Sequence, residues 1–87
     1  MIVEKKIWPS GFEKIQSGKK FYDVRINDFQ IAEGDTLVLK EFDPAAKQYT
    51  GRKIEKKVSS VTRLDRLFEM YNENELKQKG LLLIEMK

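Results

Sequence analysis

Residues 36–61, TLVLKEFDPAAKQYTGRKIEKKVSSV, are the stretch of sequence that decides the fold. The segments 36–42 and 52–61 carry the side-chain pattern of two strands. Between them, residues 43–51 contain Asp, Pro and Gly, which are turn formers. The sequence therefore predicts a long β-hairpin joined by the loop 43–51.

Shorter segments on both sides of this hairpin also predict strands. Residues 2–7 alternate apolar and charged side chains, as a half-buried strand does. Residues 21–26, FYDVRI, alternate as well, which places Asp23 and Arg25 on the same face. Residues 81–86 are strongly apolar and predict a closing strand.

Helical signals lie between these strands. The segment SGFE at 10–13 reads as a capping box, so a first helix is expected over about residues 11–17. The apolar residues of 62–71 recur at helical spacing and predict a second helix that begins at Thr62. Residues 74–79 suggest one further helical turn. The expected order is β-α-β-β-β-α-β, an α+β fold of five strands with two to three short helices.

Composition limits both the size of the protein and its chemistry. The chain has 87 residues, of which 40% are hydrophobic, and it contains neither Cys nor His. One globular domain, 1–87, is expected, without disulfides, thiol nucleophiles or a Cys/His metal site. No run of about 18 apolar residues or secretion signal is seen, which predicts a cytoplasmic protein without membrane contact. Closing so small a sheet into a barrel would remove its exposed edges.

Residues 18–25, GKKFYDVR, resemble the ASCH signature G-x-K-x-x-E-x-R, with Asp23 where that family usually has Glu. The flanking segments within 5–61, such as KIWP at 6–9, resemble the DUF3850 subgroup of ASCH-like domains. The resemblance implies a PUA-like, five-stranded mixed β-barrel. ASCH domains are generally proposed to bind RNA, so an RNA or nucleotide-like ligand at a basic barrel mouth is expected.

The signature residues are the first candidates for ligand binding. Arg25 offers a planar fork for a phosphate or a base edge, and Lys20 offers a point charge. Asp23 is expected between these two cations, where it would hold both. An ion pair between Asp23 and Arg25 that only caps one end of the barrel is the alternative.

Two further regions add candidates. Trp8 is the only Trp of the chain and stands beside the first helix, where it could stack on a base or pack in the core. The hairpin is rich in Lys and Arg, which suits either a phosphate backbone or an edge strand that resists aggregation. The predicted ligand-binding set is Trp8, Lys19, Lys20, Asp23, Arg25, Lys40 and Arg52.

Two other functions remain open from the sequence. Some bacterial ASCH relatives hydrolyse N4-acetylcytidine, using a threonine, a lysine and a glutamate. Lys20 matches the lysine, and Asp23 stands where those enzymes have the threonine. If the domain is an enzyme, Lys20, Asp23 and Glu41 are the candidate catalytic residues, although strand alternation favours a solvent-facing Glu41. A protein-interaction domain is the third hypothesis. A monomer or weak dimer without metal or cofactor is expected.

Overall fold

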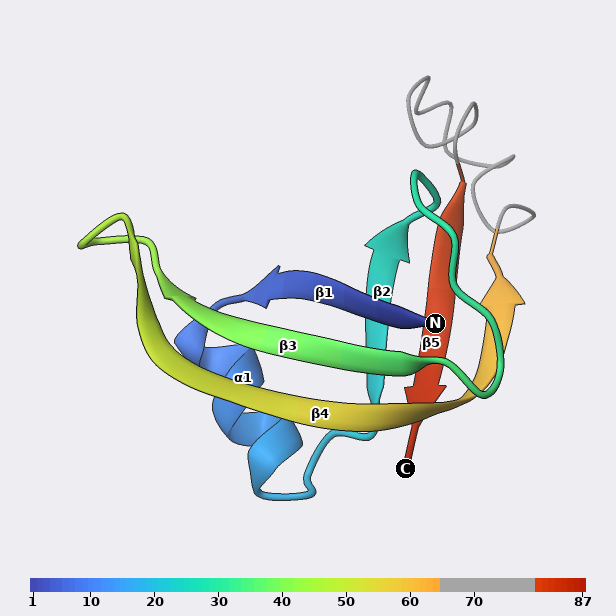
Figure 1. The fold of residues 1–87 in the computed structure, drawn as a ribbon, viewed down its shortest axis with the longest axis horizontal. Coiled ribbons are helices and arrows are strands. Elements are labelled where there is room, and N and C mark those ends of the chain that lie inside the picture. Colours follow the sequence, from blue (N-terminus) through green and yellow to red (C-terminus); the bar gives the residue numbers. More distant parts are fainter. Residues whose placement is uncertain (65–79) are drawn as a thin grey trace.

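A computed structural model describes residues 1–64 and 80–87. Within these ranges the chain forms five strands and one helix (Figure 1). In chain order, the elements are β1 (Ile2–Ile7), α1 (Pro9–Gln16), β2 (Tyr22–Ile26), β3 (Thr36–Asp43), β4 (Gln48–Arg63) and β5 (Leu81–Met86).

All five described strands belong to one mixed sheet, in the order β1-β3-β4-β5-β2. β1 pairs with β3 in parallel, and the other neighbours are antiparallel. The long strand β4 serves both halves of the sheet, because residues 48–57 pair with β3 and residues 58–63 pair with β5. The sheet therefore bends along β4, and β2 and β5 cross behind β1 and β3 (Figure 1).

The core lies between the two halves of the bent sheet and is covered on one side by α1. Phe12 and Ile15 on the inner face of α1 are fully buried, which contributes about 1.5–3 kcal/mol for each side chain. Phe29 and Ile31, in the link after β2, pack against this core as expected. The buried core cluster consists of Ile7, Phe12, Ile15, Leu37, Leu39, Val58, Leu82, Ile84 and Met86.

The predicted closure of the sheet into a barrel is wrong. β1 and β2 are the two edges of the described sheet and do not pair with each other. The side chain of Arg25 crosses the seam between them, and its Nη2 donates a hydrogen bond of 2.6 Å to the backbone carbonyl of Lys6. A guanidinium thus satisfies an edge carbonyl that a neighbouring strand would satisfy in a closed barrel.

The first helix begins earlier than the sequence predicts. Trp8 is the N-cap residue, with extended backbone angles, and no side chain caps the helix. Pro9 follows at the first helical position, where its fixed φ is suitable and its missing N–H is not needed. The capping box predicted for Ser10 is therefore wrong. Gly18 ends the helix with a φ of 79°, as expected for a left-handed stop.

The β3–β4 hairpin is tighter than predicted. Asp43 pairs with Gln48, so that only residues 44–47 form the turn. The partners of Lys40 and Phe42 are Lys53 and Tyr49, which leaves Thr50, Gly51 and Arg52 opposite Glu41 in a β-bulge. Gly51 has a φ of 93°, a conformation that glycine adopts without a steric penalty.

At its far end β4 is also longer than predicted. Thr62 and Arg63 pair with Leu83 and Leu82 of β5, so the chain is still a strand where the second helix was expected to begin. The rest of that predicted helix, and the predicted turn at 74–79, lie outside the described residues.

The bulge predicts a clear effect of one substitution. Gly51→Ala should destabilise the protein by about 1–2 kcal/mol, because an L side chain is strained at positive φ even though open space surrounds this position. Urea unfolding measures the change. Gly51→Asn should cost less, since Asn tolerates the left-handed region better. Equal stability of the Ala variant and the parent would contradict the bulge.

Candidate functional site

The signature residues of β2 meet on the inner side of the sheet. Asp23 is buried, and its Oδ2 accepts a hydrogen bond of 2.7 Å from Nε of Arg25. The two side chains share a face because they are two residues apart in a strand, as the sequence predicts. Arg25 also reaches Lys6 on β1, so the carboxylate and the carbonyl hold the guanidinium from two sides.

A cleft of about 310 Å³ opens beside this guanidinium. Lys5 on β1 is one of its walls, and its Nζ lies 3.7 Å from the centre of the Phe29 ring. The side chain of Arg25 is 23% exposed, and two of its hydrogen-bonding groups are already used. The lining residues are Lys5, Val24, Arg25, Ile26, Asp28 and Phe29.

Lys5 and Phe29 were not among the predicted site residues. The sequence did contain a sign of Lys5, because it lies on the same face of β1 as Val3 and Ile7 and so places a charge on the inner face. The sequence contains no comparable sign for Phe29, since an aromatic residue in a link between strands is as often a core residue as a binding residue.

The predicted lysines of the signature lie elsewhere. Nζ of Lys20 is 5.2 Å from the centre of the Tyr22 ring, and Tyr22 faces the opposite side of β2 from Asp23. Lys19 lines a separate depression beside α1. The expectation of Asp23 between two cations is therefore replaced by a single ion pair with Arg25 among the described residues.

Glu41 is the second buried carboxylate of the described core, with an exposed fraction of 3%. The expectation that Glu41 faces solvent is wrong. Glu41 lies on the inner face of β3, which it shares with Leu37 and Leu39. Its Oε1 accepts hydrogen bonds from Oγ1 of Thr50 at 2.7 Å and Nε of Arg52 at 2.9 Å.

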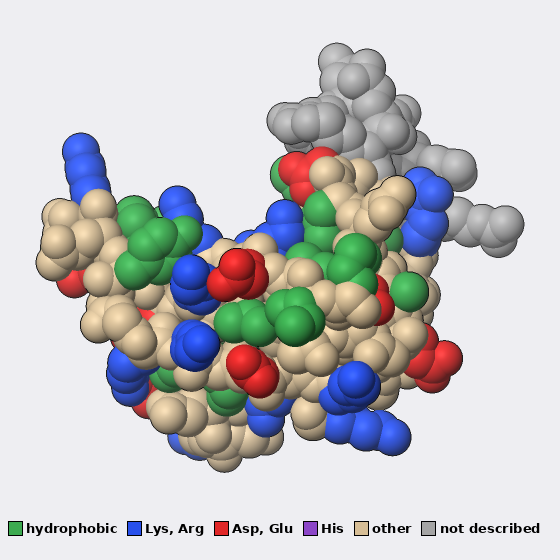
Figure 2. Space-filling view, in the orientation of Figure 1, with side chains coloured by type: hydrophobic (Ala, Val, Ile, Leu, Met, Phe, Trp, Pro, Cys, Tyr) green, Lys and Arg blue, Asp and Glu red, His purple; other side chains and the backbone are tan. Residues whose placement is uncertain are grey.

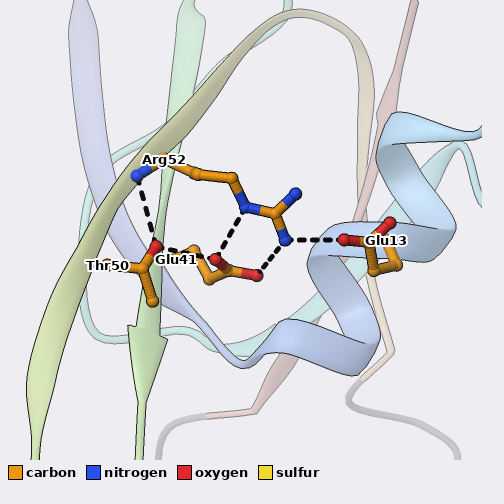
Figure 3. A network of polar contacts seen from close by, with 4 residues as sticks. All are labelled: Glu13, Glu41, Thr50 and Arg52. Atoms are coloured by element: carbon orange, nitrogen blue, oxygen red, sulfur yellow. Dashed lines mark hydrogen bonds and ion pairs between the residues drawn. The ribbon is translucent and has the colours of Figure 1, made fainter.

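Arg52 joins this carboxylate to the helix (Figure 3). Its Nη2 donates to Oε2 of Glu41 at 2.7 Å and to Oε1 of Glu13 on α1 at 2.6 Å. Its guanidinium carbon also lies 4.6 Å from the centre of the Phe12 ring. Arg52 was predicted to bind a ligand, and the structure shows it fastening α1 to the hairpin.

The hydrogen bonds of this network set its charge state. Those from Arg52, and then from Thr50, hold the pKa of Glu41 below its ordinary value of 4.5. The hydrogen bonds to Glu41, and then to Glu13, raise the pKa of Arg52 above its already high ordinary value. The network therefore consists of charged groups at neutral pH.

The remaining predicted residues, Trp8 before α1 and Lys40 in β3, do not face the core. Trp8 is 61% exposed, so it does not pack in the core. Lys40 points away from the inner face of β3 and forms an ion pair of 3.3 Å with Glu4. Of the predicted set, the structure thus brings together only Asp23 and Arg25.

The three residues proposed for catalysis belong to three separate interactions. Lys20 lies over Tyr22, Asp23 pairs with Arg25, and Glu41 is held by Arg52 and Thr50. Residues 1–64 and 80–87 contain no group of three or more acidic side chains arranged to bind a metal ion. In the same ranges, no helix has the length and apolar character needed to span a membrane.

The lowered pKa of Glu41 predicts how stability depends on pH. Its contribution is fully present above the unfolded-state pKa of about 4.5 and is lost as the pH falls through the lower folded-state value. Glu41→Gln should lower the unfolding midpoint at pH 7 and flatten the loss of stability on acidification. The exposed Glu55→Gln, on the outer face of β4, is the matched control. Parallel acid profiles of Glu41→Gln and the parent would contradict this prediction.

Two solved structures share this fold. The crystal structure of the hypothetical protein PH0355 superposes with a TM-score of 0.73 at 21% identity, covering 100% of this chain and 98% of that one. The solution structure of protein PF0455 from Pyrococcus furiosus gives a TM-score of 0.58 at 17% identity, covering 100% and 96%.

Sequence comparison gives closer relationships. An uncharacterized 12.9 kDa protein from the GpA 3′ region of Escherichia phage P2 is 36% identical over 70 residues, which are 80% of this chain. The matched region is 62% of the phage protein's length. The model of the domain of unknown function DUF3850 matches residues 2–74. The chain therefore belongs to the DUF3850 family.

Proposed function

We propose that this domain binds RNA or a nucleotide at the cleft between β1 and β2. The observation that carries the proposal is the guanidinium of Arg25, which Asp23 and the carbonyl of Lys6 hold in one orientation at the wall of the cleft. A guanidinium has five N–H donors, so donors remain for a phosphate or a base edge. Holding the group beforehand lowers the entropy lost on binding.

The other walls of the cleft suit the same class of ligand. Lys5 adds a second positive charge, and the ring of Phe29 lies under its ammonium group. An ammonium that leaves the ring for a phosphate would free an aromatic face for a base. The volume of about 310 Å³ is at the lower end of the range for small-ligand pockets and suits one nucleoside unit.

The family resemblance supports the same proposal independently of the cleft. Residues 18–25 resemble the signature of ASCH domains, whose proposed ligand is RNA. In this chain the Arg of that signature lines the cleft, and the Asp is its ion-pair partner. An ASCH-type, PUA-like binding module is therefore the function that the geometry supports best.

Arg25→Lys and Lys5→Gln test the cleft. Arg25→Lys keeps the charge beside Asp23 and removes the fork, whereas Lys5→Gln removes a charge and keeps most of the side chain. Each variant should weaken binding of cytidine monophosphate about tenfold, the effect of losing one hydrogen bond to a charged group. NMR titration of labelled protein measures the affinity and shows which amides shift.

The same titration identifies the ligand class and includes a control. Lys14→Gln, on α1, has the same change of charge away from the cleft and should bind as the parent does. Shifts with N4-acetylcytidine followed by the appearance of cytidine would indicate the deacylase reaction instead. If neither a mononucleotide nor a short single-stranded RNA shifts the amides of 5–6 and 23–29, the cleft proposal fails.

A further inference from the structure

The outer face of β1, β3 and β4 carries a row of three lysines. In the register of the sheet, Lys40 lies between Lys6 on β1 and Lys53 on β4. In an antiparallel pair such as Lys40 with Lys53, directly opposite residues have Cβ atoms about 4.5–5.5 Å apart, and like charges at that distance destabilise a sheet. We call these three residues the lysine row. Three neighbouring like charges destabilise the folded sheet, and such an arrangement is typical of a functional site, here one that binds an anion.

Only part of this positive charge is neutralised within the protein. Lys40 forms an ion pair of 3.3 Å with Glu4, which stands in the next row of the same face together with Glu55. Within the described ranges, Lys6 and Lys53 have no carboxylate at salt-bridge distance. Lys6 instead lies over an aromatic ring, with its Nζ 4.1 Å from the centre of Phe42.

An aromatic pair continues the row toward the hairpin turn. Phe42 and Tyr49 are cross-strand partners, with ring centres 5.3 Å apart and ring planes at 78°. Tyr49 is 52% exposed, and Nζ of Lys40 lies 5.4 Å from its centre. Figure 2 looks onto this face. From the hairpin turn at the left toward the middle of the face, green hydrophobic side chains come first, then blue Lys and Arg side chains, and then red and green side chains.

We propose that the lysine row and the aromatic pair form a second contact surface for single-stranded nucleic acid. Phosphates bind the lysine row, and a base stacks on the ring of Tyr49 or Phe42 as the ammonium groups leave the rings. A duplex does not fit this chemistry, because its bases are already stacked on one another. An acidic peptide would use the lysines and leave the rings without a partner.

This surface extends the cleft, so the inference rests on the proposed function for its ligand class. Lys5 and Lys6 are consecutive residues of β1 and point to opposite faces of the sheet. β1 is an edge strand, so a chain bound in the cleft can pass over that edge to the lysine row. An oligonucleotide should therefore bind more tightly than a mononucleotide, which reaches the cleft alone.

The salt dependence of oligonucleotide binding tests the lysine row. For the parent and for the double variant Lys6→Gln/Lys53→Gln, the affinity for oligocytidylate is measured by fluorescence anisotropy over a range of salt concentrations. Each phosphate contact on a single strand contributes about 0.7 to the slope of log affinity against log salt, so the slope should fall by about 1.4. The control Lys14→Gln/Lys57→Gln changes the net charge equally and should keep the parent's slope.

A second variant tests the rings. Tyr49→Leu keeps an apolar side chain and removes the stacking platform, so affinity for oligocytidylate should fall about tenfold with an unchanged salt slope. Binding of cytidine monophosphate at the cleft should be unchanged in Tyr49→Leu, because Tyr49 does not line the cleft.

The outcomes separate this inference from the proposed function. If the Lys6/Lys53 variant keeps the slope and affinity of its control, the proposal of an outer binding surface is wrong. The mononucleotide titration then still tests the proposal of binding in the cleft. If polyglutamate competes as well as oligocytidylate and Tyr49→Leu has no effect, the surface takes acidic protein segments and the inference is wrong. A reduced slope together with a weakened Tyr49→Leu variant supports it.

Discussion

The buried carboxylate of Glu41 is the group on which the rest of the structure depends. A charge in a core is costly unless hydrogen bonds and an opposite charge surround it. Arg52 supplies two of these bonds and Thr50 a third, and both residues lie opposite Glu41 only because the bulge at Gly51 places them there. Arg52 then reaches Glu13, so the arrangement fixes the hairpin register and the position of α1 together.

A fixed register has consequences on both faces of the sheet. On the outer face it aligns the lysine row and brings Phe42 beside Tyr49. On the inner face, the parallel pairing of β1 with β3 brings Lys5 to the seam with β2, which Arg25 bridges. The two proposed binding surfaces therefore lie on either side of one edge strand, and both depend on the same hairpin.

The sequence predicted what depends on local pattern. Alternation located β1 and placed Asp23 and Arg25 on one face, and the apolar run 81–86 located β5. The open seam between β1 and β2 was not predicted, because it is bridged by a hydrogen bond from Arg25 to a carbonyl in another strand. The bulge was misread as a loop, because a glycine such as Gly51 is typical of both. The partner of Glu41 could not be found either, since the shifted register that creates the pair is a property of the folded hairpin.

The order of the strands also determines when each can form during folding. Residues 44–47 join β3 to β4 in a tight turn, whereas β2 pairs with β5 from the other end of the chain, as in Tyr22 with Glu85. Contacts so distant in sequence form slowly, because the entropy of loop closure comes first. Until β5 pairs with it, β2 is an unpaired strand, and charged residues within such strands oppose self-association. Asp23 and Arg25 are charges of this kind, placed within β2.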